Sequence, residues 1–298
     1  MKPAPFKYFA PQSVPEVLEL LTEHGYDAKI LAGGQSLVPM MNFRLVQPAV
    51  LVDINNIPEL SYIEPHDKGV RLGAMVRHSQ TEKDPLIKEY APLIHETMPE
   101  IATVQIRNRG TIGGSLAHAD PSAELVVVST ALEAKFKIQN QKGERLVPAS
   151  EFFVGLLMTS MEPEDLLVEI QIPALPAHSG WSLKEVARRP HDFALMGVAA
   201  VLTLDKEERC TEARLVYLSA GDGPIAAPQA ANLLVGNEIT PELITAAAEK
   251  AAVDEIDPGS DIHATAEFRR HLANVLTRRA LDEAVQRAKG GKNGDYHE

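Results

Sequence analysis

Short apolar runs separated by polar turns divide the first 55 residues into a small α/β unit. Ser13 and Glu16 have the spacing of a capping box, which predicts that a helix begins there. Mainly apolar runs at 28–32 and 50–54 are typical of short strands, and a brief helix is expected between them over 37–45. The pattern therefore predicts two strands with helices before and between them.

Proline positions divide the middle of the chain. Residues 78–102 follow a helical pattern that we expect to be interrupted at Pro85, Pro92 and Pro99, because proline lacks the N–H group that a helix interior needs. The other elements predicted in this part are strands at 60–64 and 70–74 around a turn at 66–69, a helix over 121–132 with Asp120 as a candidate N-cap, and strands at 134–139 and 166–172. Together they predict a second unit of mixed helices and strands.

A Pro-, Ala- and Gly-containing linker at 173–180 precedes the last part of the chain. The elements predicted beyond it are strands at 181–188, 197–204 and 212–219, followed by helices at 228–235, 241–253 and 263–288. The last ten residues are rich in Gly, Lys and Asn and predict a flexible tail. Strands followed by helices indicate an α+β C-terminal domain.

Two glycine segments are the candidate functional feature. The first is residues 32–36 (AGGQS) and the second is residues 109–115 (RGTIGGS). Glycine allows another molecule to approach the main chain closely, and successive exposed N–H groups form a site for an anion such as a pyrophosphate. The hydroxyls of Ser36, Thr111 and Ser115 add possible donors. We expect the two segments to hold one phosphate-bearing ligand from two sides.

Tight turns are the alternative interpretation of both glycine pairs, since glycine is a common turn residue. Neither segment matches the phosphate-binding pattern Gly-x-x-x-x-Gly-Lys-Ser/Thr or the dinucleotide pattern Gly-x-Gly-x-x-Gly. A P-loop kinase and a Rossmann dehydrogenase are therefore disfavoured.

The acidic composition narrows the class of partner. A formal net charge of −12 over 298 residues disfavours nucleic acid and anionic membranes as partners, because both require a basic surface. No apolar run approaches the roughly 18 residues that a membrane span needs, so no transmembrane segment is expected. The N-terminus lacks the apolar core of a signal peptide, and we expect a cytoplasmic protein.

The single cysteine, Cys210, limits the metal chemistry that this chain can carry. It excludes an internal disulfide and any cysteine-ligated zinc or iron–sulfur cluster built by this chain alone. We expect Cys210 to be a small side chain near the start of a strand. His118 and Asp120 are two candidate metal ligands without a third, so no metal site is predicted. A redox cofactor would then be organic, or its metals would belong to a partner.

The glycine segments and two further motifs resemble the FAD-binding medium subunit of bacterial molybdenum hydroxylases of the carbon monoxide, xanthine and nicotine dehydrogenase type. The motifs are 32–36 (AGGQS), 107–115 (RNRGTIGGS), 120–124 (DPSAE), and Lys184 with 188–193 (RRPHDF). The resemblance extends from Phe6 to about residue 288. It implies an α+β protein with a two-subdomain FAD-binding region of the PCMH or vanillyl-alcohol-oxidase type. A C-terminal domain with a three-stranded antiparallel sheet and a helical bundle would follow.

Pattern and resemblance together divide the chain into four parts. Residues 1–55 and 56–176 would be the two FAD-binding subdomains, residues 177–288 the C-terminal domain, and residues 289–298 the flexible tail.

The resemblance also implies cofactor-binding residues. Those expected at the pyrophosphate and ribityl chain of FAD are Lys29, Ile30, Leu31, Ala32, Gly33, Gly34, Gln35, Ser36, Thr111, Ile112, Gly113, Gly114 and Ser115. Those expected elsewhere on FAD are Glu124 at the ribityl hydroxyls, Ile101 and Leu167 at the ring or adenine, and Lys184 and Phe193 near the isoalloxazine. No catalytic residue is predicted, because substrate chemistry would take place on another subunit.

Ordinary structural roles are the alternative for the residues outside the glycine segments. Ile101 and Leu167 have the character of core residues, Lys184 of a solvated strand lysine, and the Glu124 carboxylate complements a helix dipole. One position departs from the family pattern: Ser115 stands where many relatives carry Asn, and its shorter side chain changes the contact made there. The chain also lacks the Cys-rich insertion that carries an extra cluster in some aromatic acyl-CoA reductases.

An electron-transfer subunit is the function that the resemblance implies. A large subunit would carry molybdopterin and a small subunit 2Fe-2S clusters, from which FAD on this chain would receive electrons for an external acceptor. The assembly would be a heterotrimer or a dimer of heterotrimers. The alternatives are a free-standing FAD-dependent oxidase or reductase with its own substrate pocket, and a non-enzymatic scaffold whose glycine segments are structural.

Overall fold

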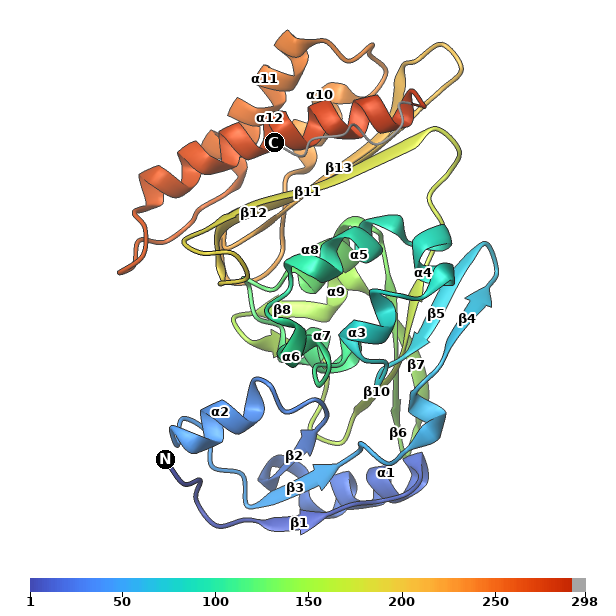
Figure 1. The fold of residues 1–298 in the computed structure, drawn as a ribbon, viewed down its shortest axis with the longest axis vertical. Coiled ribbons are helices and arrows are strands. Elements are labelled where there is room, and N and C mark those ends of the chain that lie inside the picture. Colours follow the sequence, from blue (N-terminus) through green and yellow to red (C-terminus); the bar gives the residue numbers. More distant parts are fainter. Residues whose placement is uncertain (291–298) are drawn as a thin grey trace. The chain divides into compact units, whose positions relative to one another are not determined.

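The computed structural model describes residues 1–290 and is shown in Figure 1. The chain forms two compact units. The first contains Met1–Ala119 and Glu133–Ala174, and the second contains Asp120–Leu132 and the chain from Leu175 onward. The segment Asp120–Leu132 therefore leaves the first unit and joins the C-terminal part of the chain.

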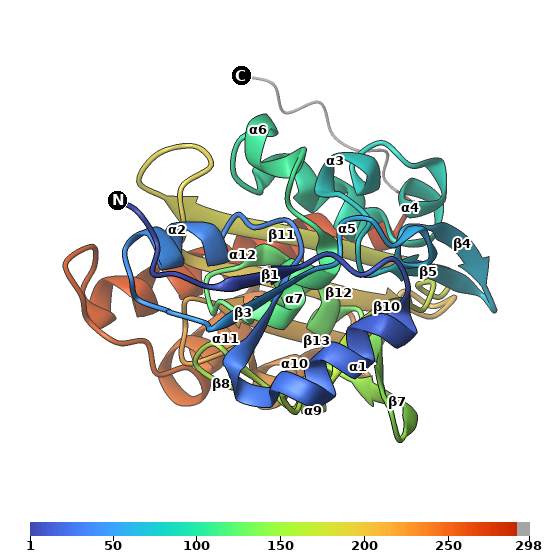
Figure 2. The ribbon, with the colours of Figure 1, turned by 90° about the horizontal axis from the view of Figure 1, so that it is seen from below.

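A parallel sheet begins the first unit. Its three strands lie in the order β1 (Lys7–Phe9), β3 (Val50–Asp53) and β2 (Ala28–Leu31). Figure 2 shows β1, β3 and α1 (Val14–His24) from below, and α1 packs on β2 and β3. The helices and strands predicted within the first 55 residues are present. Strand β1 was not predicted, because three partly exposed residues give no hydrophobic pattern.

The predicted capping box is formed only in part. The Ser13 hydroxyl accepts a hydrogen bond from the Glu16 N–H at 3.5 Å, as expected. The Glu16 carboxylate, however, accepts from the N–H of Gln12 at 2.9 Å and not from that of Ser13. A short 3-10 turn (Gly25–Asp27) follows the helix, and the brief helix predicted over 37–45 is α2 (Leu37–Asn42).

An antiparallel sheet of five strands forms the rest of the first unit. Its strands, in spatial order, are β4 (Ile63–His66), β5 (Gly69–Gly73), β10 (Leu166–Ile172), β6 (Lys135–Asn140) and β7 (Gly143–Pro148). The hairpin predicted at 60–64 and 70–74 is present, with its first strand displaced toward the turn. Strand β7 was missed because it lies at the sheet edge with both faces largely exposed.

The helical stretch predicted at 78–102 is interrupted at its prolines, as expected. Helix α4 (Pro85–Tyr90) and α5 (Pro92–Thr97) each start at a proline, and Pro99 lies in a 3-10 turn (Met98–Glu100). The remaining short elements are a 3-10 turn (Pro58–Leu60), α3 (His78–Thr81), α6 (Val104–Arg107), α7 (Ile112–His118), α9 (Ala149–Phe152), β8 (Phe153–Gly155) and β9 (Met158–Thr159).

Helix α8 (Glu124–Ala131) begins the second unit and corrects the prediction of a helix over 121–132. Asp120 is not its N-cap. Its carboxylate accepts from the N–H of Ser122 at 2.9 Å and its carbonyl from that of Ala123 at 3.0 Å, which closes a turn before the helix. The N–H of Ser219 donates to the Pro121 carbonyl at 2.9 Å, so this turn is bound to the C-terminal sheet.

The C-terminal sheet is antiparallel and has four strands where three were predicted. They are β11 (Ser179–Ala187), β12 (Ala194–Leu204), β13 (Cys210–Leu218) and β14 (Ile225–Ala226), in that order. The two-residue β14 is too short to give a pattern. Cys210 begins β13 and is buried, as expected, and burial raises the pKa of its thiol to about 11.

Helices cover one side of this sheet. They are α10 (Pro228–Leu234), α11 (Pro241–Lys250) with a π-helical continuation (Ala251–Glu255), and α12 (Ala266–Ala288). Helix α12, red in Figure 1, packs on β11 and β12. The buried hydroxyls of Tyr217 and Thr277 lie 2.6 Å apart and join the sheet to this helix.

The predicted flexible tail, 289–298, falls largely outside the described residues. Lys289 and Gly290 form a turn after α12, and the Lys289 ammonium pairs with the Glu208 carboxylate at 2.6 Å. Residues 291–298 are not described.

Gly180 tests the packing of α12 on the sheet. An added Cβ there would lie 1.7 Å from the Ala284 carbonyl oxygen, so we expect Gly180→Ala to lower the free energy of unfolding by at least about 3 kcal/mol. Urea unfolding followed by circular dichroism measures this change. The control is Gly223→Ala, where a Cβ meets nothing within 4 Å. Equal stability of the two variants would contradict the packing described here.

Candidate functional site

The two glycine segments are in contact within the first unit. An added Cβ at Gly33 would lie 2.5 Å from the carbonyl oxygen of Arg109 and 2.8 Å from the Cα of Gly110. One at Gly114 would lie 3.4 Å from the Cβ of Ala32. Segments that are far apart in the sequence therefore meet main chain to main chain, and only glycine at position 33 permits this approach.

The first glycine segment presents unbonded N–H groups. It follows β2, and Gly34 adopts a left-handed conformation with φ of 73°. Within residues 1–290, the N–H groups of residues 33–36 donate none of the hydrogen bonds found, whereas the carbonyls of Ala32 and Gly33 accept from Asn55 at 2.9 Å and Gln35 at 3.1 Å. Four consecutive N–H groups of the described chain are thus without a partner, and those of Gln35 and Ser36 belong to exposed residues, so this segment can donate to an anion.

The second glycine segment differs from its prediction. Its glycine pair lies in the first turn of α7 and not in a loop, and Thr111 is the N-cap. The N–H groups of this turn are all bonded within the chain: Ile112 to the Val76 carbonyl at 3.0 Å, Gly113 to the Ala74 carbonyl at 2.9 Å, Gly114 to the Thr111 hydroxyl at 3.1 Å, and Ser115 to the Thr111 carbonyl at 3.0 Å. This segment therefore offers close approach, but its N–H groups are already used.

Two residues that sequence analysis missed join the segments. One guanidinium nitrogen of Arg77 donates to the Arg109 carbonyl, and the other donates to the Asn55 side-chain oxygen at 2.6 Å. The Asn55 amide in turn donates to the Ala32 carbonyl at 2.9 Å. Asn55 could have been found from its position, because it follows the carboxyl end of β3 beside the strand that leads to Gly33. Arg77 carries no comparable signal.

The charged groups around this junction are Asp53 and two arginines. Burial raises the pKa of the Asp53 carboxyl, but hydrogen bonds from Tyr8 at 2.6 Å and from Asn55, together with the charge of Arg109, hold it below its usual value. Burial and the Arg109 guanidinium lower the pKa of Arg77, and Asp53 opposes them. Arginine remains charged at neutral pH despite such a shift.

His78 packs against the second glycine segment. Its main-chain N–H donates to the Gly110 carbonyl at 3.0 Å, and an added Cβ at Gly110 would lie 3.1 Å from the imidazole ring. The side chain is buried, and burial, with smaller effects from the Arg107 and Arg77 guanidiniums, lowers its pKa to about 4. His78 is therefore neutral at physiological pH.

The other residues of the first unit that were predicted to contact FAD differ in their exposure to solvent. Lys29 is exposed on β2, while Ile30 and Leu31 are half-buried. Leu167 is buried in β10. Ile101 is also buried, and its carbonyl accepts from Arg107 at 3.1 Å.

Three predicted residues belong to the second unit. Glu124 is the first residue of α8 and is buried, while Phe193 is 73% exposed between β11 and β12. The Lys184 ammonium pairs with the Glu283 carboxylate of α12 at 2.5 Å. This ion pair gives Lys184 a role in joining sheet and helix, distinct from the contact with FAD that was predicted for it.

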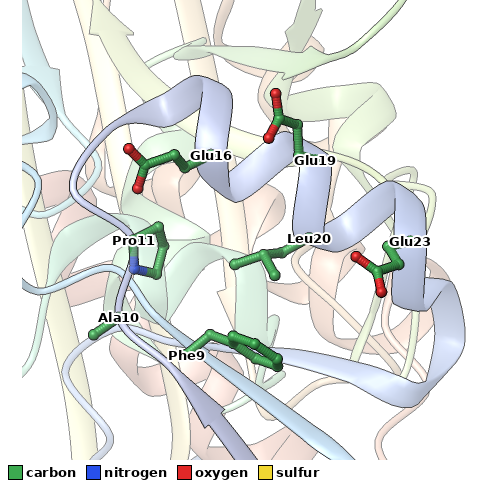
Figure 3. A pocket seen from close by; sticks show the side chains of 7 residues that line it. All are labelled: Phe9, Ala10, Pro11, Glu16, Glu19, Leu20 and Glu23. Carbon is green, nitrogen blue, oxygen red and sulfur yellow. The ribbon is translucent and has the colours of Figure 1, made fainter.

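A separate hollow of about 330 Å³ lies between α1 and the end of β1 (Figure 3). Its lining residues are Phe9, Ala10, Pro11, Glu16, Glu19, Leu20 and Glu23. Three carboxylates at this hollow disfavour an anionic ligand such as a pyrophosphate. In the part of the chain that the structure describes, no group of three or more His, Cys, Asp or Glu side chains could hold a metal ion, and no helix is long and apolar enough to cross a membrane.

Comparison with known proteins gives two family matches. Residues 4–175 match the FAD binding domain in molybdopterin dehydrogenase, and residues 181–284 match the CO dehydrogenase flavoprotein C-terminal domain. Together the two matches cover most of the chain.

Individual relatives match over almost their whole length. The chain is 42% identical over 297 residues to the 6-hydroxypseudooxynicotine dehydrogenase complex subunit alpha of Paenarthrobacter nicotinovorans, with 100% of both chains covered. It is 37% identical to the carbon monoxide dehydrogenase medium chain of Hydrogenophaga pseudoflava, covering 96% of this chain and 99% of the relative.

Solved structures of related enzymes match the chain over nearly its whole length. Carbon monoxide dehydrogenase from Hydrogenophaga pseudoflava, in a form lacking the Mo-pyranopterin moiety of the molybdenum cofactor, matches with a TM-score of 0.93 and 38% identity, covering 96% of this chain and 99% of that chain. Quinoline 2-oxidoreductase from Pseudomonas putida 86 matches with a TM-score of 0.92 and 38% identity, covering 97% of this chain and 99% of that chain. The chain therefore belongs to the family of FAD-binding flavoprotein subunits of molybdenum-containing dehydrogenases, an oxidoreductase family whose cofactor on this subunit is FAD.

Proposed function

We propose that the chain binds FAD at the contact of its two glycine segments and transfers electrons as one subunit of a larger enzyme. The observation that carries this proposal is the row of four unbonded N–H groups at 33–36, next to the place where the second segment approaches most closely. Free N–H groups in a left-handed turn suit the oxygens of a pyrophosphate.

The two glycine segments would make different kinds of contact with FAD. The first segment, with Lys29 beside it, would donate hydrogen bonds to the pyrophosphate. The second segment would lie against the ligand through its glycines, and of its predicted donors only the Ser115 hydroxyl is not already a helix cap. Ile101 and Leu167 at the ring or adenine, Glu124 at the ribityl hydroxyls, and Lys184 near the isoalloxazine remain predictions.

FAD supplies reversible one- and two-electron chemistry, and the residues of this chain would bind and orient it. The proposed electron donor is a small subunit with 2Fe-2S clusters, itself supplied by a large molybdopterin subunit. The names of relatives as complex subunit alpha and as medium chain support such an assembly. The single cysteine is consistent with clusters held by partners.

A free-standing FAD-dependent oxidase or reductase is the alternative. It is less well supported, because the chain matches dehydrogenase subunits over nearly their whole length and the hollow described above is acidic and separate from the glycine segments. The division into parts at 1–55, 56–176, 177–288 and 289–298 and the cytoplasmic location also remain predictions.

Gly33 provides a direct test of FAD binding. The purified chain, titrated with FAD and followed by visible absorption and flavin fluorescence, should bind it. Gly33→Ala should weaken binding by about 10- to 100-fold, because relieving the overlap with Arg109 costs about 1–3 kcal/mol.

The matched control for that titration is Gly155→Ala, whose Cβ would meet only Met158 at ordinary contact distance. It should bind FAD as the wild type does. Unchanged affinity in Gly33→Ala would contradict the proposed site. A wild-type chain that binds no FAD, alone or with partner subunits, would contradict the function.

His78 predicts how the stability of the first unit depends on pH. Its folded-state pKa of about 4 lies below the ordinary 6.5, so the unfolded chain takes up the proton first as the pH falls. Stability is complete above pH 6.5 and is lost as the pH falls toward 4. Between pH 7 and pH 5, His78 should account for about 2 kcal/mol of lost unfolding free energy.

Urea unfolding at several pH values measures this contribution. His78→Asn should lower stability at pH 7 but remove the His78 part of the pH dependence. The control, His66→Asn, changes a partly exposed histidine in β4 of the same unit and should keep the His78 part of the pH dependence. An unaltered slope in His78→Asn would show that the imidazole titrates normally.

A further inference from the structure

Arg77 stands at the contact of the two glycine segments without belonging to either. It precedes α3, and its backbone pairs with Thr111 in an isolated antiparallel bridge. Its guanidinium is the group that touches both sides of the junction: the Arg109 carbonyl directly, and the Ala32 carbonyl through Asn55. The family motifs at 32–36 and 107–115 do not include it.

The partners of Arg77 leave its charge uncompensated. Both hydrogen bonds of its guanidinium go to neutral oxygens, and in residues 1–290 it forms no ion pair with a carboxylate. Asp53 is the acidic group that acts on it, but Asp53 is also bound by Tyr8 and influenced by Arg109. Two guanidiniums and one carboxylate leave a positive charge at the junction.

Main-chain sources of positive potential are weak at this junction. The N–H groups in the first turn of α7 are already bonded to carbonyls and to the Thr111 hydroxyl. The N–H groups at 33–36 carry only partial charges. Full charges come from the two guanidiniums, of which Arg109 is exposed and Arg77 is half-buried. The charge of Arg77 is therefore screened less by solvent and favours a doubly charged pyrophosphate more strongly than the partial charges do.

We propose that Arg77 is a specificity-determining residue, which holds the two glycine segments together and makes the site prefer flavins that carry a pyrophosphate over uncharged flavins. This inference rests on the proposed FAD function and deepens it. The Arg77 guanidinium fixes the position of the two segments relative to each other, since it donates to two acceptors at once. Its charge favours the phosphates of the ligand.

The test compares FAD with riboflavin, which lacks the phosphates, on the full-length chain. Arg77→Met removes the charge and the fork. It should weaken FAD binding by about 10- to 100-fold while riboflavin affinity stays within about 3-fold of wild type. FAD binding by the wild type should also weaken more steeply with added salt than binding by Arg77→Met.

The matched control is Arg44→Met, which removes an exposed arginine of the same unit whose guanidinium, within residues 1–290, donates to the Lys2 carbonyl alone. It should change neither affinity by more than about 3-fold. Equal loss of FAD and riboflavin affinity in Arg77→Met would overturn the inference, because it would show a purely structural role. A loss of FAD affinity in Arg77→Met that is no larger than the loss in Arg44→Met would also overturn the inference.

Arg77→Lys keeps the test decisive if Arg77→Met does not fold. Lysine retains the charge but cannot donate to both acceptors in the same geometry. It should keep the preference for FAD over riboflavin within about 3-fold of the wild-type ratio, with riboflavin affinity within about 3-fold of wild type, as in Arg77→Met. Loss of that preference would overturn the role of charge. A wild-type chain that binds riboflavin and FAD equally refutes this inference alone, whereas one that binds neither refutes the proposed function.

Discussion

The main-chain contact between Gly33 and Arg109 is the constraint on which the candidate site depends. The space for a side chain at position 33 is filled by a carbonyl oxygen 2.5 Å from where a Cβ would stand. The two larger sheets of the first unit each lie behind one side of this contact. The parallel strand β2 leads into the first glycine segment, and the carbonyls of Ala74 and Val76, just beyond β5, hold the start of α7. The site is thus a junction between two sheets, stabilised by Asn55 and Arg77.

The two glycine pairs are chemically similar in sequence and act differently in the structure. In the first segment the left-handed Gly34 leaves neighbouring N–H groups without acceptors. In the second, the glycines permit a helix to start against the chain at Ala74, and its N–H groups are bonded there. The pair therefore combines a donor surface with a close-packed support, and an anion would meet its hydrogen-bond donors on one side only.

Sequence reasoning found the features that depend on local chemistry. Prolines mark the starts of α4 and α5, Cys210 lies buried at the start of β13, and both glycine segments were identified. It missed a local turn at Asp120, where the N–H groups of Ser122 and Ala123 bond back to Asp120 and delay α8 to Glu124. It also failed where distant groups decide, since α7 begins at Ile112 because Ala74 and Val76 supply acceptors. Arg77 gains its role only from tertiary contacts, which no spacing reveals, whereas Asn55 could have been located from its place after the carboxyl end of β3.

Amide hydrogen exchange with and without FAD tests the central claim most directly. The account predicts that the N–H groups at 33–36, unbonded in the chain alone, become protected when FAD binds. The N–H groups of Ile112 and Gly113 should change little, because they already donate to Val76 and Ala74. Binding of FAD that leaves 33–36 unprotected, or that protects the first turn of α7 in their place, would contradict the account.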